Sequence, residues 1–302
     1  MNWRIALKST LVLFLLGGCL NAQDLPLLGL NHVGIAVSDI DRARLFYHDV
    51  IGLDMGFDLI RPDLTLFLQY YKVNDHEYIE VYPTLKPDSI VRETHIAFYT
   101  EDIEKLHQAL DARGLHPTPV KTSHWDGNQS FDLRPAPAQD IVFMEFIQYM
   151  PGSLHTNNFG KALSAKRIST HMRGVGVLVT DPVAAEALYK AMDFKEVWRG
   201  TTGEGQTKLI DMQLPGPSGD YVELVERLTK PNAEQAGRAG RVILEVSDIK
   251  AAYNEAKQRN AKGLTPPARI AGKGWSFDVF DPDGTMVSFV QPSAGTQKTA
   301  GP

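Results

Sequence analysis

Two histidines and two glutamates occur at matching positions in the first half of the 302-residue chain. Glu80 follows His32 by 48 residues, and Glu145 follows His95 by 50 residues. Taken singly, a strand histidine is more often a core or edge residue, and a strand glutamate usually faces solvent. Together, two imidazoles and two carboxylates facing one surface would be costly to bury without a cation. The repeated spacing therefore predicts one divalent ion held by these four side chains.

The residue types limit the identity of that ion. Two nitrogen and two carboxylate ligands with open positions for water suit Ni, Co, Fe, Mn or Zn. The only cysteine is Cys19, which excludes an internal disulfide and any Cys-x-x-Cys site. The sequence does not choose among the five metals.

The four candidate ligands lie on predicted strands, where side chains alternate between the two faces of a sheet. In the strand that contains His32, β-branched residues form one face and small residues share the other face with the histidine. The second histidine strand repeats this pattern with Ile96 and Phe98 opposite His95 and Ala97. Glu80 shares a face with Tyr78 and Tyr82, and Glu145 shares one with Phe143 and Ile147. We expect all four ligands on a single concave face.

One structural unit occurs four times in the chain. Each copy has a short strand, an aspartate seven positions after the strand's first residue, a helix that this aspartate or a neighbour caps, and three further strands. The first strands are His32 to Asp39, His95 to Asp102, Gly174 to Asp181 and Arg241 to Asp248. The predicted helices are Arg42 to Val50, Ile103 to Asp111, Val183 to Met192 and Ile249 to Gln258. The sequence thus predicts an α+β fold of four βαβββ units.

Two such units side by side are the smallest plausible globular domain, because one unit cannot cover both faces of its sheet. We expect domains over residues 27–150 and 171–292, a linker over 151–170 and a tail over 293–302. The linker is predicted to contain a short helix around Lys161 to Lys166.

The first residues are typical of an export signal. Arg4 and Lys8 precede the short apolar run Leu11 to Leu16, which Gly17 and Gly18 close. Leu16 to Cys19 resembles the lipobox of bacterial lipoproteins, which predicts a signal peptide over residues 1–18 and a lipid on Cys19; cleavage after Ala22 is the alternative. We expect an exported protein on the periplasmic side, in contact with membrane only through that lipid.

The composition excludes several classes of protein. Disorder and coiled coil do not fit a chain that is 43% hydrophobic and 9% aromatic. Its 31 basic residues against 36 acidic ones, without a dense basic run, argue against a nucleic-acid partner. We expect a small-molecule substrate as the partner; the sequence leaves the oligomeric state open and is compatible with a monomer.

The opening stretch Leu30 to Asp39, with Ile51-Gly52-Leu53 and Thr94 to Phe98, resembles the vicinal oxygen chelate superfamily, which includes glyoxalase I, fosfomycin-resistance proteins and extradiol dioxygenases. The resemblance covers essentially everything after residue 27 and implies paired half-barrel mixed sheets. The ligand set is most similar to that of bacterial glyoxalase I, which implies that His32, Glu80, His95 and Glu145 bind the metal. It also implies that Glu145 or Glu80 moves the substrate proton.

The second half departs from this pattern. Gly174, Glu223, Arg241 and Ser288 stand where the first half has its candidate ligands, and no histidine follows His171. We therefore expect the C-terminal pair to be a scaffold, a lid or a metal-free binding module. If the first unit paired with the fourth, no complete ligand set would form, so pairing of consecutive units is favoured.

Three functions fit these residues. The first is an exported glyoxalase-like enzyme, a metal-dependent lyase or isomerase that transfers a proton on a small oxygen-rich substrate. The second is an Fe(II) extradiol-type dioxygenase, because two histidines and Glu145 alone make a suitable triad. The third is a non-catalytic binding or resistance protein. The candidate cavity walls are Tyr78, Tyr82, Tyr99 and Phe143, and His124 is a further acid–base candidate whose alternative is an ordinary loop histidine.

Overall fold

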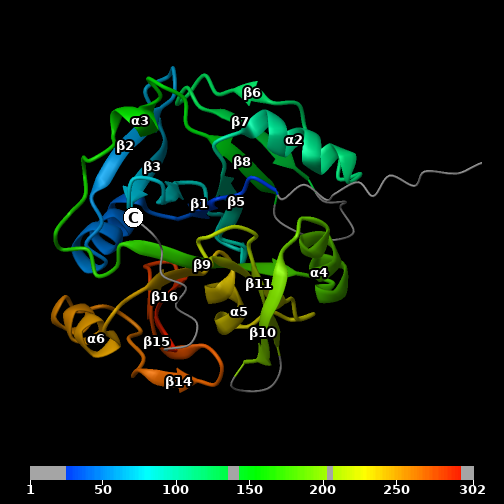
Figure 1. Ribbon diagram of the computed structural model, residues 1–302. Helices are drawn as coiled ribbons and strands as arrows, with labels where there is room; N and C mark the ends of the chain where they lie inside the picture. Colours follow the sequence, from blue (N-terminus) through cyan, green and yellow to red (C-terminus); the bar gives the residue numbers. More distant parts are fainter. Residues whose placement is uncertain (1–24, 135–142, 203–206, 294–302) are drawn as a thin grey trace, which may run out of the picture.

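The protein folds into two curled mixed sheets of eight strands, as a computed structural model shows for residues 25–134, 143–202 and 207–293. Figure 1 shows the first sheet in the upper half of the molecule and the second in the lower half. The strand orders are β2-β3-β4-β1-β5-β8-β7-β6 and β10-β11-β12-β9-β13-β16-β15-β14, so the two sheets share one topology. The α+β fold of four βαβββ units is confirmed.

Consecutive units share a sheet, as the distribution of ligands favours. In the first sheet β1 lies between β4, to which it is parallel, and β5, to which it is antiparallel. Its strands are β1 (Gly29–Ala36), β2 (Met55–Ile60), β3 (Leu66–Lys72), β4 (Tyr78–Tyr82), β5 (Glu93–Tyr99), β6 (Lys121–Thr122), β7 (Gln129–Leu133) and β8 (Met144–Gln148).

The second sheet repeats these pairings, with β9 between β12 and β13. Its strands are β9 (His171–Val179), β10 (Lys195–Thr201), β11 (Lys208–Gln213), β12 (Tyr221–Glu226), β13 (Val242–Glu245), β14 (Ala268–Ile270), β15 (Gly274–Phe280) and β16 (Met286–Pro292).

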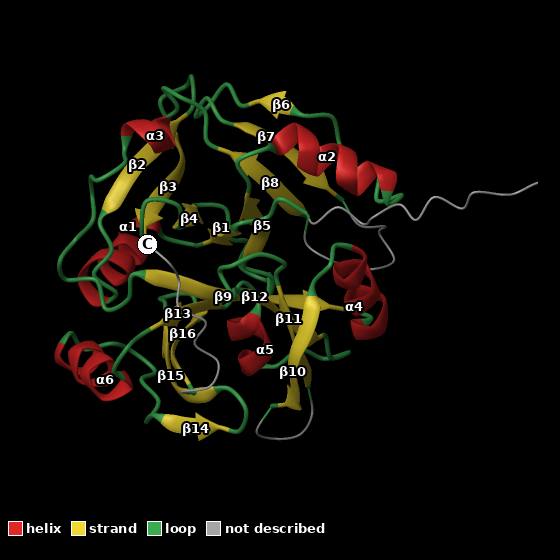
Figure 2. Cartoon of the chain, in the orientation of Figure 1, coloured by secondary structure: helices red, strands yellow, loops and turns green. Residues whose placement is uncertain are grey.

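Each unit's main helix begins at the predicted aspartate. The side chains of Asp39, Asp102, Asp181 and Asp248 each accept a hydrogen bond from a backbone N–H in the first turn. Figure 2 shows these four main helices at the periphery of the strands. They are α1 (Ile40–Arg44), which continues as a π-helix over Leu45–Val50, α2 (Ile103–Ala112), α4 (Pro182–Ala191) and α6 (Ile249–Gln258); the short α3 (Leu154–Asn157) and α5 (Ala233–Arg238) lie between units.

The predicted helix around Lys161 to Lys166 is wrong. The short helix of this segment is α3, where Ser153 caps the N-terminus by accepting a hydrogen bond from the Thr156 N–H. Near Lys161 the backbone turns instead, because Ala162 has a positive φ of 51° and the buried Lys72 Nζ binds the Lys161 carbonyl.

The two faces of each sheet have different roles. A single cluster of buried apolar residues contains the outward faces of both sheets, including Val33 and Ile35 of β1 and Val175 and Val177 of β9. Two smaller clusters occupy the opposite faces, one in each sheet. The shared core fixes the sheets, and each concave face, called a cup below, combines a small apolar cluster with polar side chains.

Two predictions lie outside the described residues. One is the signal segment 1–18 with Cys19 and Ala22, and the other is the tail, most of which is not described. Among the residues that the structure describes, no helix is long and apolar enough to cross a membrane.

Candidate metal centre

The four predicted ligands meet in the N-terminal cup. His32 Nε2 lies 2.8 Å from His95 Nε2, and it lies 3.4 Å from both Glu80 Oε1 and Glu145 Oε2. His95 Nε2 lies 3.3 Å from Glu80 Oε2 and 3.7 Å from Glu145 Oε2. Both rings therefore turn the same nitrogen toward one point between the carboxylates.

The strand register produces this convergence. Gly34 of β1 lies opposite Glu80 of β4 on one side and opposite His95 of β5 on the other. On β8, Glu145 lies opposite Ala97, two residues after His95. Because side chains alternate, the small residues Gly34 and Ala97 leave room in the cup for the four longer ones.

Hydrogen bonds fix the tautomer of His32. Asn31 Nδ2 donates to the His76 carbonyl at 2.9 Å, so the amide oxygen of Asn31 must face His32 Nδ1, which lies 2.7 Å away. The Nδ1 atom therefore carries the proton and donates to Asn31 Oδ1. This leaves a lone pair on Nε2, as a metal ligand requires.

His95 is held in a similar way. Its Nδ1 lies 2.9 Å from Thr94 Oγ1, and its ring stacks on Phe143 at 5.1 Å between centroids. A Cβ on Gly34 would lie 2.7 Å from His95 Nδ1, so only glycine gives the imidazole its space.

The two carboxylates differ in their solvent exposure. Glu80 has a side chain that is 3% exposed and accepts a hydrogen bond from the Tyr82 hydroxyl at 2.6 Å. The Glu145 side chain is 20% exposed. Glu145 is therefore the carboxylate that a molecule in the cup can reach.

Burial and nearby charges shift the pKa values of these groups in opposite directions. Burial alone raises the pKa of Glu145, but positive charge on His32 and His95 and a hydrogen bond from a protonated His32 outweigh it and lower the pKa to about 2; a bound cation would take the place of that proton on His32 Nε2. Burial lowers the pKa of His32, yet Glu80 and Glu145 give a net rise; for His95 the burial effect prevails and its pKa falls.

The donor set fits a divalent cation. Nitrogen lone pairs 2.8 Å apart repel each other unless a proton or a cation lies between them. Two neutral imidazoles and two ionised carboxylates supply the N2O2 set of a first-row metal. His32, His95 and Glu145 also each offer an atom within 4.8 Å of the other two.

A cavity of about 350 Å³ opens beside the four residues. Tyr82 and Phe143 line it as predicted, whereas Tyr78 and Tyr99 do not and pack instead in the aromatic cluster behind it. His124 is exposed and packs against Trp125 with its ring tilted by 38°; of these two residues, the tryptophan lines the cavity and the histidine does not.

Several polar residues of the cavity are not anticipated from the sequence. They are Lys121, Ser123, Asp126, Asn128, Ser130, Asp132 and Arg134. The triplet Ser130-Phe131-Asp132, which recurs as Ser276-Phe277-Asp278, could have indicated two of them, because residues one and three of a strand share a face. The loop residues carry no periodic pattern that places them.

The C-terminal cup holds a different arrangement at the matching positions. Arg241 Nη1 donates to Glu223 Oε1 at 2.5 Å, and Arg241 Nε donates to Ser288 Oγ at 2.7 Å. Lys273 Nζ lies 3.0 Å from Glu223 Oε2. Arg238 Nη1 also donates to Glu223 Oε1 at 3.0 Å, so two guanidinium groups and an ammonium neutralise the glutamate that a metal would neutralise in the other cup.

A second group of possible ligands joins the two domains. His171 Nδ1 lies 2.8 Å from Glu77 Oε1, and its Nε2 lies 3.1 Å from Asp220 Oδ1. Both ring nitrogens are occupied by separate carboxylates, which raise the pKa of His171 to about 11 although burial alone lowers it. The imidazolium is therefore a bridge between Glu77 of the first domain and Asp220 of the second.

Solved structures similar to this fold include extradiol dioxygenases. Homoprotocatechuate 2,3-dioxygenase from Brevibacterium fuscum, in an anaerobic complex with 3,4-dihydroxyphenylacetate, has a TM-score of 0.62 and 15% identity, over 90% of this chain and 83% of that chain. The 2,3-dioxygenase LapB from Pseudomonas sp. KL28 has a TM-score of 0.63 and 14% identity, over 91% of this chain and 97% of that one. At this identity the likeness concerns the fold.

Comparison with curated proteins finds no match. The family model described as Glyoxalase/Bleomycin resistance protein/Dioxygenase superfamily matches residues 29–134 and 171–289, one segment in each sheet and most of the chain. The chain therefore belongs to this superfamily, also known as the vicinal oxygen chelate superfamily, as its sequence resemblance implies.

Proposed function

We propose that this protein is a metal-dependent enzyme of the glyoxalase type, which transfers a proton on a small oxygen-rich substrate bound in the N-terminal cup. The observation that carries the proposal is the convergence of His32, Glu80, His95 and Glu145 beside a cavity. Four metal ligands favour this proton transfer over the dioxygenase reaction, which uses a centre of three protein ligands.

In this proposal the four side chains hold one divalent ion, with Ni, Co, Fe, Mn and Zn as candidates. The ion would act as a Lewis acid on substrate oxygens. Glu145 takes the substrate proton, because it is the more exposed of the two carboxylates, and Glu80, held by Tyr82, is the alternative base. Phe143 and Trp125 exclude water from the reacting centre.

A second candidate is an Fe(II) extradiol-type dioxygenase. His32, His95 and Glu145 each offer one ligand atom within 4.8 Å of the other two, which supports a two-histidine, one-carboxylate centre. Binding without turnover is the third candidate.

Metal analysis of protein purified without chelator tests the centre first. We expect close to one divalent ion per chain, and we expect His95→Ala to lose it while His124→Ala, a control at an exposed histidine of the same domain, retains it. Full metal content in His95→Ala would refute the assignment.

Two assays of the metal-loaded protein separate the candidate reactions. Exchange of substrate C–H for deuterium in D2O, followed by NMR across a panel of α-hydroxyketones, supports proton transfer; Glu145→Gln should then reduce exchange about 100-fold or more. Oxygen uptake with catechols, only in the iron-loaded form, would select the dioxygenase instead. A ligand-induced spectral shift without either reaction would select the binding protein.

We also propose that the protein is exported and anchored through Cys19, on the basis of its N-terminal sequence alone. Mass spectrometry of the full-length product isolated from a bacterial host tests this. A lipidated N-terminal cysteine supports the proposal, and an intact Met1 contradicts it.

A further inference from the structure

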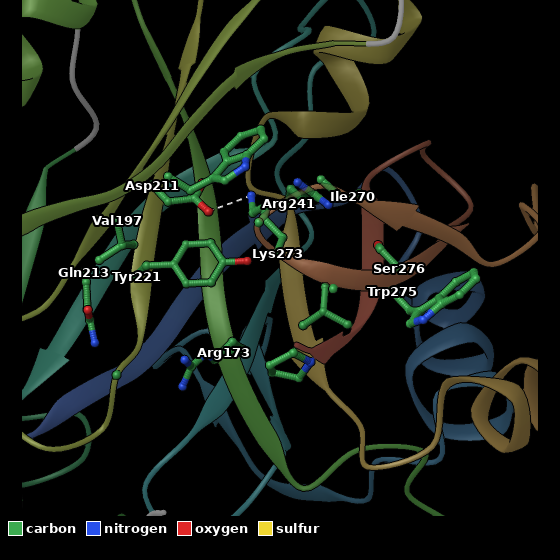
Figure 3. Close-up of a pocket in the computed structure, with 16 residues that line it drawn as sticks. Arg173, Val197, Asp211, Gln213, Tyr221, Arg241, Ile270, Lys273, Trp275 and Ser276 are labelled. Atoms are coloured by element: carbon green, nitrogen blue, oxygen red, sulfur yellow. Dashed lines mark ion pairs between the residues drawn. The ribbon is translucent and has the colours of Figure 1, made fainter. Parts of the chain in front are cut away.

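The C-terminal cup contains a second cavity, and no set of metal ligands is among the described residues that line it. It has a volume of about 150 Å³, similar to a cavity that accommodates benzene. Figure 3 shows Tyr221, Lys273 and Asp211 in its centre, with Val197 and Trp275 on opposite sides. The cationic groups of Arg241 and Lys273 take the place beside Glu223 that a metal would take in the other cup, and the space next to them remains available to an organic molecule.

Aromatic rings form the walls of this cavity. Trp198 and Tyr221 both line it, and Lys273 Nζ lies 4.2 Å from the Trp198 ring centre and 5.2 Å from the Tyr221 ring centre. The indole of Trp198 is fixed, because its Nε1 donates to the Ala271 carbonyl at 2.9 Å. Trp275 is 44% exposed at the rim. These flat surfaces suit a planar ring.

The charged lining is mostly cationic. Arg173, Arg241 and Lys273 line the cavity, with Asp211 as the one acidic residue among those that line it. Lys273 Nζ already forms ion pairs with Asp211 Oδ2, at 2.6 Å, and with Glu223 Oε2, at 3.0 Å. The two arginines are therefore the groups with donors to spare.

Both arginines keep N–H donors that the described residues do not use. Arg241 donates through Nε and Nη1, while its Nη2 reaches Asp278 Oδ1 only at 3.9 Å, beyond hydrogen-bond distance. Arg173 Nη1 donates to the Ser218 carbonyl, and Arg173 Nε lies 3.5 Å from Glu245 Oε2. A guanidinium with free N–H groups in a largely buried position binds a carboxylate well.

We propose that the C-terminal cup is a metal-free binding site for a small aromatic carboxylate. The ring lies among Trp198, Tyr221 and Trp275, and the carboxylate accepts hydrogen bonds from the Arg241 guanidinium, with Arg173 as the second cation. The site lies in the second sheet and is independent of the metal centre of the first. The proposal therefore goes beyond the proposed function.

Binding of 4-fluorobenzoate to the full chain, followed by ¹⁹F NMR and calorimetry, tests this. The probe should bind equally to metal-loaded and chelator-treated protein, since the cup needs no metal. The neutral analogue 4-fluorobenzyl alcohol should bind at least about tenfold more weakly, because it cannot replace the charged hydrogen bonds.

Two variants locate the site. Arg241→Lys keeps a cation opposite Glu223 but removes Nη2, and Trp275→Ala removes an exposed wall with little risk to folding; each should weaken binding about tenfold. Trp125→Phe, which alters only the other cup, is the control and should leave affinity unchanged. If Arg241→Lys does not fold, Trp275→Ala and the neutral analogue remain decisive.

Several results would overturn the proposal. These are absence of binding to the chelated protein, equal binding of the neutral analogue, and affinity that Trp275→Ala leaves intact. Binding that chelation removes would assign the probe to the N-terminal centre. Absence of metal from the purified protein, by contrast, would refute the proposed function and leave this inference standing.

Discussion

At the scale of single residues, the N-terminal centre depends on groups that do not themselves contact the candidate metal. Asn31 is fully buried, and its Nδ2 donates hydrogen bonds to the His76 carbonyl and the Tyr149 hydroxyl. Its Oδ1 is therefore the atom that accepts from His32. The resulting Nδ1–H tautomer presents the His32 Nε2 lone pair to the cup. Asn31 is thus a positioning residue.

Replacing Asn31 by alanine should weaken metal binding about tenfold to hundredfold, because the ring loses its orientation and its fixed tautomer. Competition with a chromophoric chelator measures this affinity. Asn157→Ala, which removes an exposed asparagine, serves as the control. An unchanged affinity in Asn31→Ala would show that the hydrogen bond does not position His32.

At the scale of elements, strand β1 has to be narrow where it passes the centre. A Cβ built on Gly34 lies 2.0 Å from Thr94 Oγ1 and 2.7 Å from His95 Nδ1, both on the neighbouring strand. These contacts are far too short, so either β5 or the imidazole would have to move.

We therefore expect Gly34→Ala to lower the free energy of unfolding by about 1–3 kcal/mol and to reduce metal content, because the added methyl overpacks the cup. Urea unfolding and metal analysis measure the two effects. Gly56→Ala on β2 is the matched control, since a Cβ there makes only ordinary contacts of 3.4 Å or longer. Normal metal content in Gly34→Ala would show that β5 adapts to the added methyl.

The elements also show how far the sequence predicts the fold and the site. Alternation with period two and the capping aspartates are local properties, so the strands, the main helices and the shared face of the four ligands could be predicted. The loop residues Asp126 and Asn128 could not, because their place in the cavity depends on the path of a loop. The helix predicted near Lys161 failed because Lys72, distant in sequence, binds that backbone.

At the scale of the whole molecule, the bridge at His171 couples the two sheets. Glu77 Oε2 also accepts the Met172 N–H, and Asp220 Oδ2 accepts the Leu30 N–H at 2.9 Å. Each carboxylate therefore binds both the imidazolium and a backbone group. The interface is stabilised by a charge that the unfolded chain carries only at low pH.

This gives a pH-dependent stability. The folded pKa of His171, about 11, exceeds the ordinary value of about 6.5, so its contribution is complete below about pH 6.5 and is lost as the pH rises toward 11. His171→Gln should lower the free energy of unfolding by about 2 kcal/mol at pH 6, and the difference from the parent protein should shrink at pH 10. Urea unfolding at the two pH values measures this, with His116→Gln, at an exposed side chain, as the control. A deficit that is equal at both pH values would exclude the proton linkage.

The common core beneath both sheets has a consequence for how such a duplicated chain can diverge. Apolar residues on one side of most strands determine whether the polypeptide folds, whereas alternate positions on the other side determine what each half can hold. Exchanges at those alternate positions leave the architecture intact provided that charge stays balanced. One half can thus retain a metal centre. The other half, in which Arg241 and Lys273 are permanent internal counterions, can evolve a different binding function.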